Sequence, residues 1–272
     1  MQTMKTILIT GAGGLIGRSL RLHLRGVYEQ LRLADIAEQE PAGPGEVVLR
    51  TDIRDLAALE TAMQSVDCVV HLAGMPGEAP WDTIRALNID GCYNMFEAAH
   101  RQKVQRVIFA SSNHAVGFHR RSRVLDDQVL PRPDTRYGVS KVFGEALGRL
   151  YADKHDLSVA CLRIGSFCFP DRPAESRQLL SWVSHRDLAQ LVRRCIDHPD
   201  YHFLVAYGVS NNRRSRWSNR HADFLGYAPQ DDSEIYAEEI LALGKTEDPV
   251  AAPFHGGFYC PIEFDGDMDR ID

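Results

Sequence analysis

Short hydrophobic runs alternate with longer stretches of mixed polarity along the first two thirds of the chain. Each run is five to seven residues long and mostly apolar, which is typical of strands buried on both faces of a sheet. The stretches between them place leucine and alanine at three- and four-residue spacing, which predicts amphipathic helices. The runs predicted to be strands cover residues 6–10, 31–35, 46–50, 67–72, 104–110 and 157–163.

Four helices are predicted, each between two of these strands, over residues 15–25, 56–64, 81–101 and 137–154. Strands that alternate with helices form parallel sheets with helices on both faces. The sequence therefore predicts an α/β fold of the Rossmann type, with a doubly wound parallel sheet.

The pattern becomes less regular after residue 163. A loop rich in proline and aromatic residues is predicted over 167–173, followed by a helix that Ser184 caps and that runs to Cys195. Residues 203–207 are predicted to be a seventh strand, and short helices and loops complete the chain. We expect residues 1–272 to form one domain, with a dinucleotide-binding core over 1–166 and a small C-terminal part over 167–272 that covers the substrate.

The composition is that of an ordinary globular protein, with 44% hydrophobic and 25% charged residues. The formal charge is -6 and the basic residues are scattered, so we do not expect nucleic acid as a partner. The only local basic run is His119-Arg-Arg-Ser-Arg123. We interpret it first as a solvated loop and second as a contact for a subunit or an anion.

The six cysteines show no Cys-x-x-Cys pair and have no histidine at metal-ligand spacing beside them. Several lie within apolar runs, as Cys68 and Cys161 do, and buried free thiols indicate a reducing compartment. No apolar stretch has the length of a membrane span, and the N-terminus lacks the features of a secretion signal. We expect a cytoplasmic protein with no membrane partner and no metal.

A glycine-rich turn separates the first strand from the first helix. Its spacing is Gly11-x-x-Gly14-x-x-Gly17, which differs from the Gly-x-Gly-x-x-Gly pattern because Ile16 occupies the place of the third glycine. A strand before the turn and a helix after it favour a pyrophosphate site at the helix N-terminus over a turn with no ligand. The residues predicted to contact the cofactor here are Gly11, Gly14, Leu15, Ile16 and Gly17.

Asp35 ends the second predicted strand, where a carboxylate accepts hydrogen bonds from both ribose hydroxyls and repels a 2′-phosphate. No arginine follows it, so the sequence favours NAD over NADP. A surface aspartate that opens a loop is the alternative. Further cofactor contacts are predicted at the ends of the third and fourth strands, from Asp52, Ile53, Leu72, Ala73 and Gly74.

Tyr137 and Lys141 lie one helical turn apart and on the same face of a predicted helix. A tyrosine with a pKa near 10 is a poor base at neutral pH, but a nearby cation lowers that pKa. We predict Tyr137 as the general base, with Lys141 lowering its pKa and binding the nicotinamide ribose. An exposed pair with no function is the alternative, but the position after the fifth strand argues against it.

The segment Ser111-Ser-Asn-His114 ends the fifth predicted strand and should line the same crevice as Tyr137. A hydroxyl here aligns the substrate oxygen that loses its proton to Tyr137. We prefer Ser112 for this role, and Asn113 is the alternative because the strand register is uncertain by one residue. His114 is either a substrate contact or a capping or core histidine.

Together these features resemble the extended short-chain dehydrogenase/reductase superfamily over residues 6–166, and within it the uronate dehydrogenase family. The most specific segments are Ser111-Ser-Asn-His114 and Trp182-Val-Ser-His185. The remaining resemblance lies in residues 31–35, 109–110, 137–145, 163–166 and 177–181.

The resemblance implies that NAD oxidises D-glucuronate and D-galacturonate at C1 to aldaric acid lactones, with a sugar acid as the small-molecule partner. Carried over residue by residue, the family's substrate contacts fall on Ser112, Asn113, His114, Tyr137, Ser166 and Arg177. An arginine fork and a serine hydroxyl suit the carboxylate of a uronate. Arg172 and Arg163 also lie near Arg177 in the sequence, and Met75-Pro76 replaces a serine that the family pattern leads us to expect.

Two other functions are compatible with the same motifs. One is a nucleotide-sugar epimerase or dehydratase that keeps NAD bound and recycles it, although little more than a hundred residues follow the sixth strand to hold a nucleotide. The other is a non-catalytic module that senses NAD, although such a module has no need of Tyr137 and Lys141. We also expect a homo-oligomer, in which the helices over 81–101 and 137–154 pair between subunits.

Overall fold

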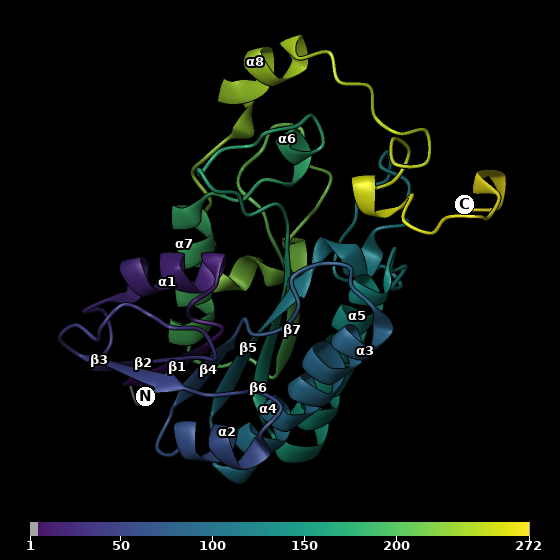
Figure 1. The fold of residues 1–272 in the computed structure, drawn as a ribbon. Helices are drawn as coiled ribbons and strands as arrows, with labels where there is room; N and C mark the ends of the chain where they lie inside the picture. The colour runs from purple at the N-terminus through teal and green to yellow at the C-terminus, as the bar shows by residue number, and fades with distance from the viewer. Residues whose placement is uncertain (1–4, 272) are drawn as a thin grey trace.

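A seven-stranded parallel sheet forms the centre of the molecule, with strand order β3-β2-β1-β4-β5-β6-β7 (Figure 1). The computed structural model describes residues 5–271. The fold class predicted from the sequence is confirmed, including the seventh strand. The strands are β1 (Thr6–Thr10), β2 (Gln30–Asp35), β3 (Glu46–Arg50), β4 (Cys68–His71), β5 (Arg106–Ser112), β6 (Ser158–Ile164) and β7 (Phe203–Gly208).

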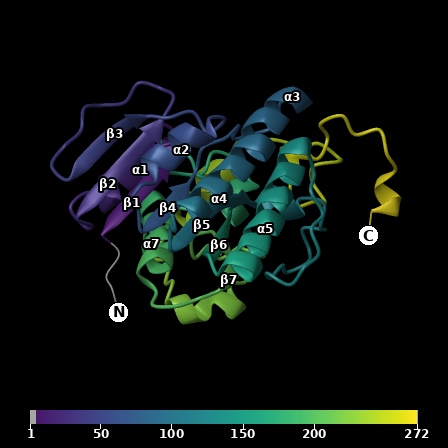
Figure 2. The same ribbon diagram turned by 90° about the horizontal axis from the view of Figure 1, so that it is seen from below.

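Helices cover both faces of the sheet, as Figure 2 shows from below. Side chains alternate along each buried strand, so Ile7 and Ile9 of β1 face one layer of helices and Leu8 faces the other. The first layer consists of α1 (Leu15–Leu24) and α7 (His185–Asp197). The second consists of α2 (Leu56–Ala62), α4 (Gly91–Arg101) and α5 (Arg136–His155).

The predicted helix over 81–101 is divided into three parts. Its first turn is α3 (Trp81–Ile84), a π-helical stretch spans Arg85–Asp90, and α4 completes it. The π-helical stretch contains Asn88. Its side-chain amide accepts a hydrogen bond from the Met75 backbone N–H and donates one to the Met75 carbonyl. This local widening, which is frequent at functional sites, ties the helix to the loop that follows β4.

The chain order of the strands reverses between β1 and β4. From β1 the chain moves outward through β2 and β3, and it then returns to the other side of β1 with β4. The connections after these two strands therefore lead away from each other and leave a crevice at the carboxyl edge of the sheet. Open α/β sheets bind ligands at such a point.

The C-terminal part forms the cover above that edge (Figure 1). It contains α6 (Gln178–Ser181), α8 (Ala237–Ala242) and several turns of 3-10 helix, while α7 and β7 from the same part of the chain complete the helical layer and the sheet. Ser184 accepts a hydrogen bond from the Asp187 backbone amide, so the predicted cap of α7 is confirmed. No helix in the described part of the chain is both long enough and apolar enough to cross a membrane.

The interpretation of the basic run at 119–123 as a solvated loop is wrong. Arg120 donates hydrogen bonds to the carbonyls of Met268 and Ile271, and Arg121 binds Glu247 and the carbonyl of Phe254. These arginines therefore hold the C-terminal segment of the chain itself against the body of the molecule.

Candidate active site

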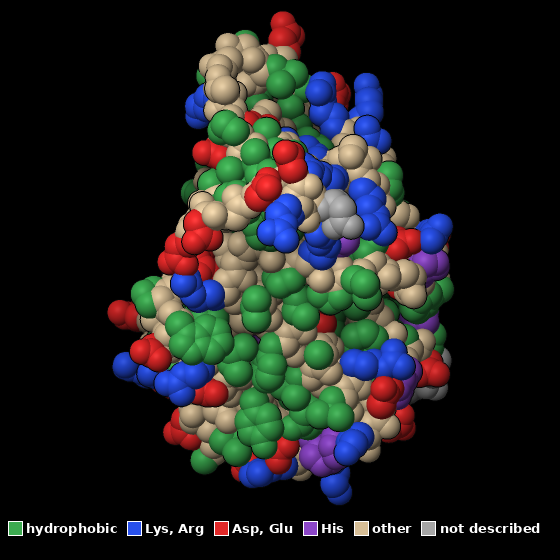
Figure 3. All heavy atoms as spheres, turned by 90° about the vertical axis from the view of Figure 1, so that its right-hand side faces the viewer, with side chains coloured by type: hydrophobic (Ala, Val, Ile, Leu, Met, Phe, Trp, Pro, Cys, Tyr) green, Lys and Arg blue, Asp and Glu red, His purple; other side chains and the backbone are tan. Residues whose placement is uncertain are grey.

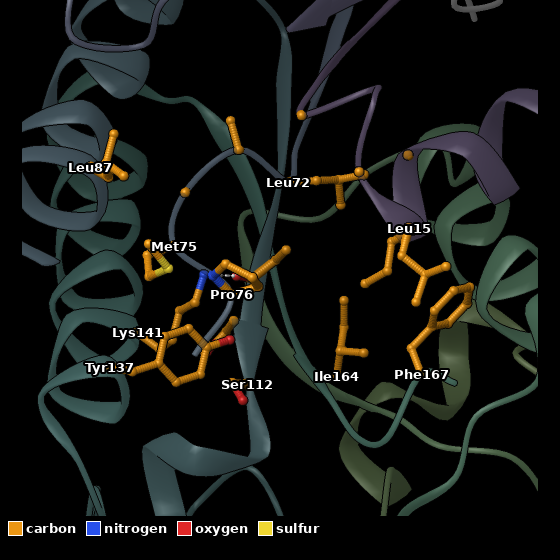
Figure 4. A pocket seen from close by; sticks show the side chains of 18 of the residues that line it. Leu15, Leu72, Met75, Pro76, Leu87, Ser112, Tyr137, Lys141, Ile164 and Phe167 are labelled. Carbon is orange, nitrogen blue, oxygen red and sulfur yellow. Dashed lines mark hydrogen bonds between the residues drawn. The ribbon is translucent and has the colours of Figure 1, made fainter. Parts of the chain in front are cut away.

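A cavity of about 580 Å³ lies at the carboxyl edge of the sheet, where the chain order reverses. It is lined by the ends of β1, β2, β4, β5 and β6 and by the first turns of α1 and α5. Figure 4 shows Tyr137, Lys141 and Ser112 close together in this cavity, with Leu15, Ile164 and Phe167 across from them. All the residues predicted from the sequence to bind cofactor or substrate line it.

The glycine turn has the shape that a pyrophosphate requires. Gly11 has φ +72°, and a Cβ on it would lie 2.7 Å from the Ala73 nitrogen, so this glycine lets the turn pass over the end of β4. A Cβ on Gly17 would lie 2.3 Å from the Gly11 carbonyl oxygen, so Gly17 lets α1 approach the turn. Gly14 is the N-cap of α1, and a Cβ on it would meet only the Gly11 carbonyl oxygen, at 3.2 Å. Gly11 and Gly17 are thus needed for the close packing of the backbone around this turn.

The Asp35 carboxylate lies beside this turn. One of its oxygens accepts a hydrogen bond from the Gly13 backbone amide at 2.9 Å, and the other accepts one from the Ala37 amide at 2.9 Å. Asp35 therefore braces the glycine turn and also presents its charge to the cavity. The donors and acceptors at this end fit the adenosine half of NAD, because the carboxylate accepts from ribose hydroxyls and the α1 N-terminus faces the phosphates.

The predicted cofactor contacts at the ends of β3 and β4 also line the cavity. Ile53 is buried and packs against Gly91, whereas Asp52 is bound by Arg54 at 2.6 Å, which lowers the pKa of the Asp52 carboxyl. Gly74 has φ +146° and lies against Asn88.

The Tyr137 side chain is buried at the first turn of α5, beside the end of β5. Burial raises its pKa above the ordinary value, and the neighbour that opposes this rise is the Ser112 hydroxyl, through a hydrogen bond. The effect of Lys141 on this phenol, one turn further along α5, stays a prediction.

The Lys141 ammonium is buried and donates a hydrogen bond to the Ala110 carbonyl at 2.9 Å. It lies over the face of the Tyr137 ring, 5.3 Å from its centre. Burial lowers the pKa of Lys141 to about 8. Lys141 and Tyr137 are therefore two buried titratable groups of the same cavity whose pKa values burial shifts in opposite directions.

The two serines at the end of β5 point in different directions. Ser111 donates a hydrogen bond to Glu145 at 2.6 Å, beneath the crevice. Ser112 interacts with Tyr137 and caps the next turn by accepting from the His114 amide at 3.2 Å. The side-chain amide nitrogen of Asn113 is buried and has no hydrogen-bond partner among the described residues. The geometry favours Ser112 beside the reacting oxygen and leaves Asn113 with a donor for a ligand.

His114 is oriented by a carboxylate. Its Nδ1 is 2.6 Å from Asp134, and its ring packs against Tyr259 with centroids 3.9 Å apart. The other edge of the ring faces Tyr137, at a centroid distance of 6.0 Å. His114 is thus fixed within the core and also lines the cavity, and its contact with a substrate stays a prediction.

Arg177 and Ser166 also line the cavity. Ser166 shares a hydrogen bond with Ser181 at 2.7 Å. The Arg177 guanidinium is buried, and its Nε donates to the His255 carbonyl at 2.9 Å. It lies 6.0 Å from the centre of the Phe258 ring, and its Nη2 has no hydrogen-bond partner among residues 5–271. A buried cationic donor without a partner is costly, so this group indicates a site for an anionic ligand.

Three aromatic residues that line the cavity, Phe167, Phe258 and Tyr259, were not predicted from the sequence as site residues. Phe258 and Tyr259 belong to a short 3-10 helix near the C-terminus and line the cavity beside Arg177 and His114. The signal that marks them is Gly256-Gly257 just before them: a Cβ on Gly257 would lie 2.0 Å from the Arg177 Cδ, so the segment docks closely only with glycine there.

Comparison with known proteins agrees with this geometry. Residues 7–195 match the NAD dependent epimerase/dehydratase family. The chain belongs to this family. It is also 40% identical to the uronate dehydrogenase of Pseudomonas putida over 256 residues, which covers 93% of this chain and 94% of the relative. The resemblance to uronate dehydrogenases is therefore confirmed.

A solved structure of uronate dehydrogenase from Agrobacterium tumefaciens superposes with a TM-score of 0.90 at 38% identity, covering 98% of this chain and 99% of that one. A mutant of that enzyme is complexed with NAD and superposes equally well. An NAD-dependent glucose-6-phosphate dehydrogenase of Haloferax volcanii is 40% identical over 257 residues, 86% of this chain and 96% of that protein. This chain is an NAD-dependent oxidoreductase of the same family.

Proposed function

We propose that this enzyme oxidises uronic acids such as D-glucuronate and D-galacturonate at C1 and releases the aldaric acid lactone. The observation that carries the proposal is the Nη2 of Arg177, a buried donor with no hydrogen-bond partner among the described residues, on a side chain that lines the same cavity as Tyr137 and Ser112. A carboxylate bound by Arg177 places the anomeric carbon of a six-membered sugar toward the other end of the substrate, near Tyr137. Ser166 and the free amide donor of Asn113 supply further contacts.

In this mechanism Tyr137 removes the proton from the C1 hydroxyl while Ser112 donates a hydrogen bond that aligns the same oxygen. Lys141 supplies the positive charge that favours the phenolate and binds the ribose next to the reacting ring. His114, fixed by Asp134, contacts the sugar from the side. Gly11–Gly17 and Asp35 would hold NAD, which would supply the acceptor for the hydride that leaves C1. Burial of the whole arrangement excludes water from the phenolate.

The cofactor contacts proposed for this mechanism are Gly11, Gly14, Leu15, Ile16, Gly17, Asp35, Asp52, Ile53, Leu72, Ala73, Gly74, Tyr137 and Lys141, all of which line the cavity. The Asp35 carboxylate at the adenosine end argues for NAD over NADP, since a 2′-phosphate there would meet a like charge.

The test is an assay of NADH absorbance with purified protein and a panel of substrates. We expect NADH to accumulate with glucuronate and galacturonate, and kcat/KM to be at least tenfold lower with NADP than with NAD. Neutral aldoses and glucose 6-phosphate should react more slowly. Turnover of nucleotide sugars without net NADH would support an epimerase instead, and NAD binding with no turnover on any sugar would support a sensing module.

A substitution at Arg177 separates recognition of the carboxylate from catalysis. We expect Arg177→Met to lower kcat/KM for glucuronate by about 10- to 100-fold, because a charge-assisted hydrogen bond contributes about 1.5–3 kcal/mol. The slow reaction with glucose, which lacks the carboxylate, serves as the matched control and should change little. Equal losses on both sugars would mean that Arg177 only supports the fold of the cover.

We also propose that the protein is a homo-oligomer that pairs through α4 and α5. Tyr93 of α4 and Val139 and Leu150 of α5 are 45–46% exposed, and Figure 3 shows hydrophobic side chains gathered on this side of the molecule. Apolar patches of this kind mark subunit contacts. Light scattering should give a mass above one chain of 30.5 kDa, and Leu150→Glu should reduce it to that of the monomer.

We propose that the chain is one domain, with a core over 1–166 and a substrate-covering part over 167–272, and that it acts in the cytoplasm. All six cysteines are free thiols, and five of them are buried, which supports a reducing compartment.

A further inference from the structure

Tyr259 brings a second phenol into the reaction cavity. Tyr137 and Tyr259 are the two tyrosines among the described residues that line it, and their ring centroids are 6.4 Å apart. They come from different parts of the chain, since Tyr137 begins α5 and Tyr259 ends the 3-10 helix Gly257–Tyr259 in the cover. The mechanism above uses only the first of them.

The position of the Tyr259 ring is fixed without help from its hydroxyl. The backbone amide of Gly256 donates to the Gly117 carbonyl at 2.8 Å, and a Cβ on Gly256 would lie 2.0 Å from the Asp134 carboxylate. The ring itself packs against His114, at 3.9 Å between centroids. The hydroxyl forms no hydrogen bond with any residue in the range 5–271. A half-buried hydroxyl that is held in place without a partner is available to a ligand.

The hydroxyl lies against the loop that follows β4. A Cβ on Gly77 would be 2.7 Å from the Tyr259 oxygen, so the phenol reaches this loop only because residue 77 has no side chain. The neighbouring Met75 and Pro76 line the cavity but offer no side-chain hydrogen-bond donor. The cover therefore supplies a polar group at a wall of the cavity where the loop side chains are apolar.

We propose that the Tyr259 hydroxyl donates a hydrogen bond to a ring hydroxyl of the sugar and thereby helps to select among sugar acids. This inference rests on the proposed function, because it requires a sugar acid bound between Arg177 and Tyr137. The inference also rests on the position of Tyr259, whose ring packs on His114 and whose hydroxyl lies against Gly77. Burial raises the pKa of Tyr259, which keeps the hydroxyl protonated as a donor at neutral pH.

The first test is Tyr259→Phe, assayed with glucuronate, galacturonate and mannuronate, which differ in the orientation of ring hydroxyls. We expect KM to rise about 3- to 10-fold for at least one of these epimers, as loss of a hydrogen bond between neutral groups predicts. We expect kcat to change less than threefold and the ratio of kcat/KM between epimers to change. Tyr236→Phe, which lies in the cover but does not line the cavity, is the matched control and should leave every constant unchanged.

The second test is Gly77→Ala, which displaces the phenol while leaving residue 259 as tyrosine. Gly77 does not have a positive φ, so alanine is tolerated by the backbone there. We expect Gly77→Ala to reproduce the KM increase of Tyr259→Phe, and we expect it to add little in the Tyr259→Phe background, where the clashing oxygen is absent.

The outcomes distinguish this inference from the proposed function. If wild-type protein forms no NADH with any sugar acid, the proposed function is wrong. If wild-type protein is active but Tyr259→Phe leaves KM and the preference among all three epimers unchanged, only the inference about Tyr259 is wrong. Independent, additive effects of the two substitutions would also overturn it, because they would not act through the same hydroxyl.

Discussion

Replacing Tyr137 with phenylalanine should abolish nearly all turnover while NAD continues to bind. The substitution removes one buried oxygen and retains the ring, which packs near His114 and Tyr259. A positioned general base contributes about 100- to 10,000-fold to the rate, so we expect kcat to fall by about 1,000-fold or more. The Kd for NAD, measured by quenching of protein fluorescence, should change less than about threefold, because the glycine turn and Asp35 are untouched.

The pH dependence strengthens this test. Burial raises the pKa of Tyr137 and lowers that of Lys141 to about 8, so both groups carry their protons at pH 6. The first proton is lost from the pair near pH 8, and in one of the resulting forms the phenolate lies beside the ammonium. The wild-type rate should therefore rise with pH between 6 and 8, whereas Tyr137→Phe should stay inactive throughout.

Tyr151→Phe is the matched control for Tyr137→Phe. Tyr151 is a buried tyrosine on the same helix, but its hydroxyl donates to Glu97 at 2.6 Å on the far side from the cavity. We expect a small loss of stability and unchanged kcat. Should Tyr137→Phe keep more than a tenth of wild-type kcat, Tyr137 would not be the base.

The core of the site could be predicted because each part of it depends on local sequence. The glycine turn follows directly from the end of β1, and Tyr137 and Lys141 are spaced by one turn of one helix. Ser112 could be predicted because it ends β5. Only the structure shows that the Ser111 side chain points to Glu145 and donates a hydrogen bond to it. Register errors of one residue matter at a strand end because successive side chains point to opposite faces.

The remainder depends on contacts between distant segments. Tyr259 lines the cavity because Gly256 packs closely against Asp134 and Gly257 against Arg177. The hydrophobic pattern of the sequence near residue 259 does not predict these contacts. The same reason explains the error at Arg120 and Arg121, whose partners lie more than 120 residues later in the chain. Helical spacing gives the distance between Tyr137 and Lys141 but not their burial, which raises the pKa of Tyr137 and lowers that of Lys141.

The ion pair beneath Ser111 and Ser112 should be the most sensitive position for stability. Glu145 of α5 and Arg163 of β6 form two hydrogen bonds of 2.8 Å, both side chains are less than 10% exposed, and Ser111 donates to the same carboxylate. Breaking a buried pair by removing one partner leaves an uncompensated charge in the core. We expect Glu145→Met to lower the free energy of unfolding by about 3–5 kcal/mol, measured by urea denaturation.

The double variant Glu145→Met/Arg163→Met decides whether the charge or the packing is responsible. With both charges removed and side chains of similar length in place, the desolvation cost disappears, so we expect the double variant to be more stable than Glu145→Met alone. In the double variant Ser111 has no acceptor for its hydrogen bond, so the end of β5 that carries Ser112 is held less firmly. We therefore expect kcat to fall even if the free energy of unfolding recovers. Stability losses that simply add would show that the pair acts through packing, with no coupling between Glu145 and Arg163.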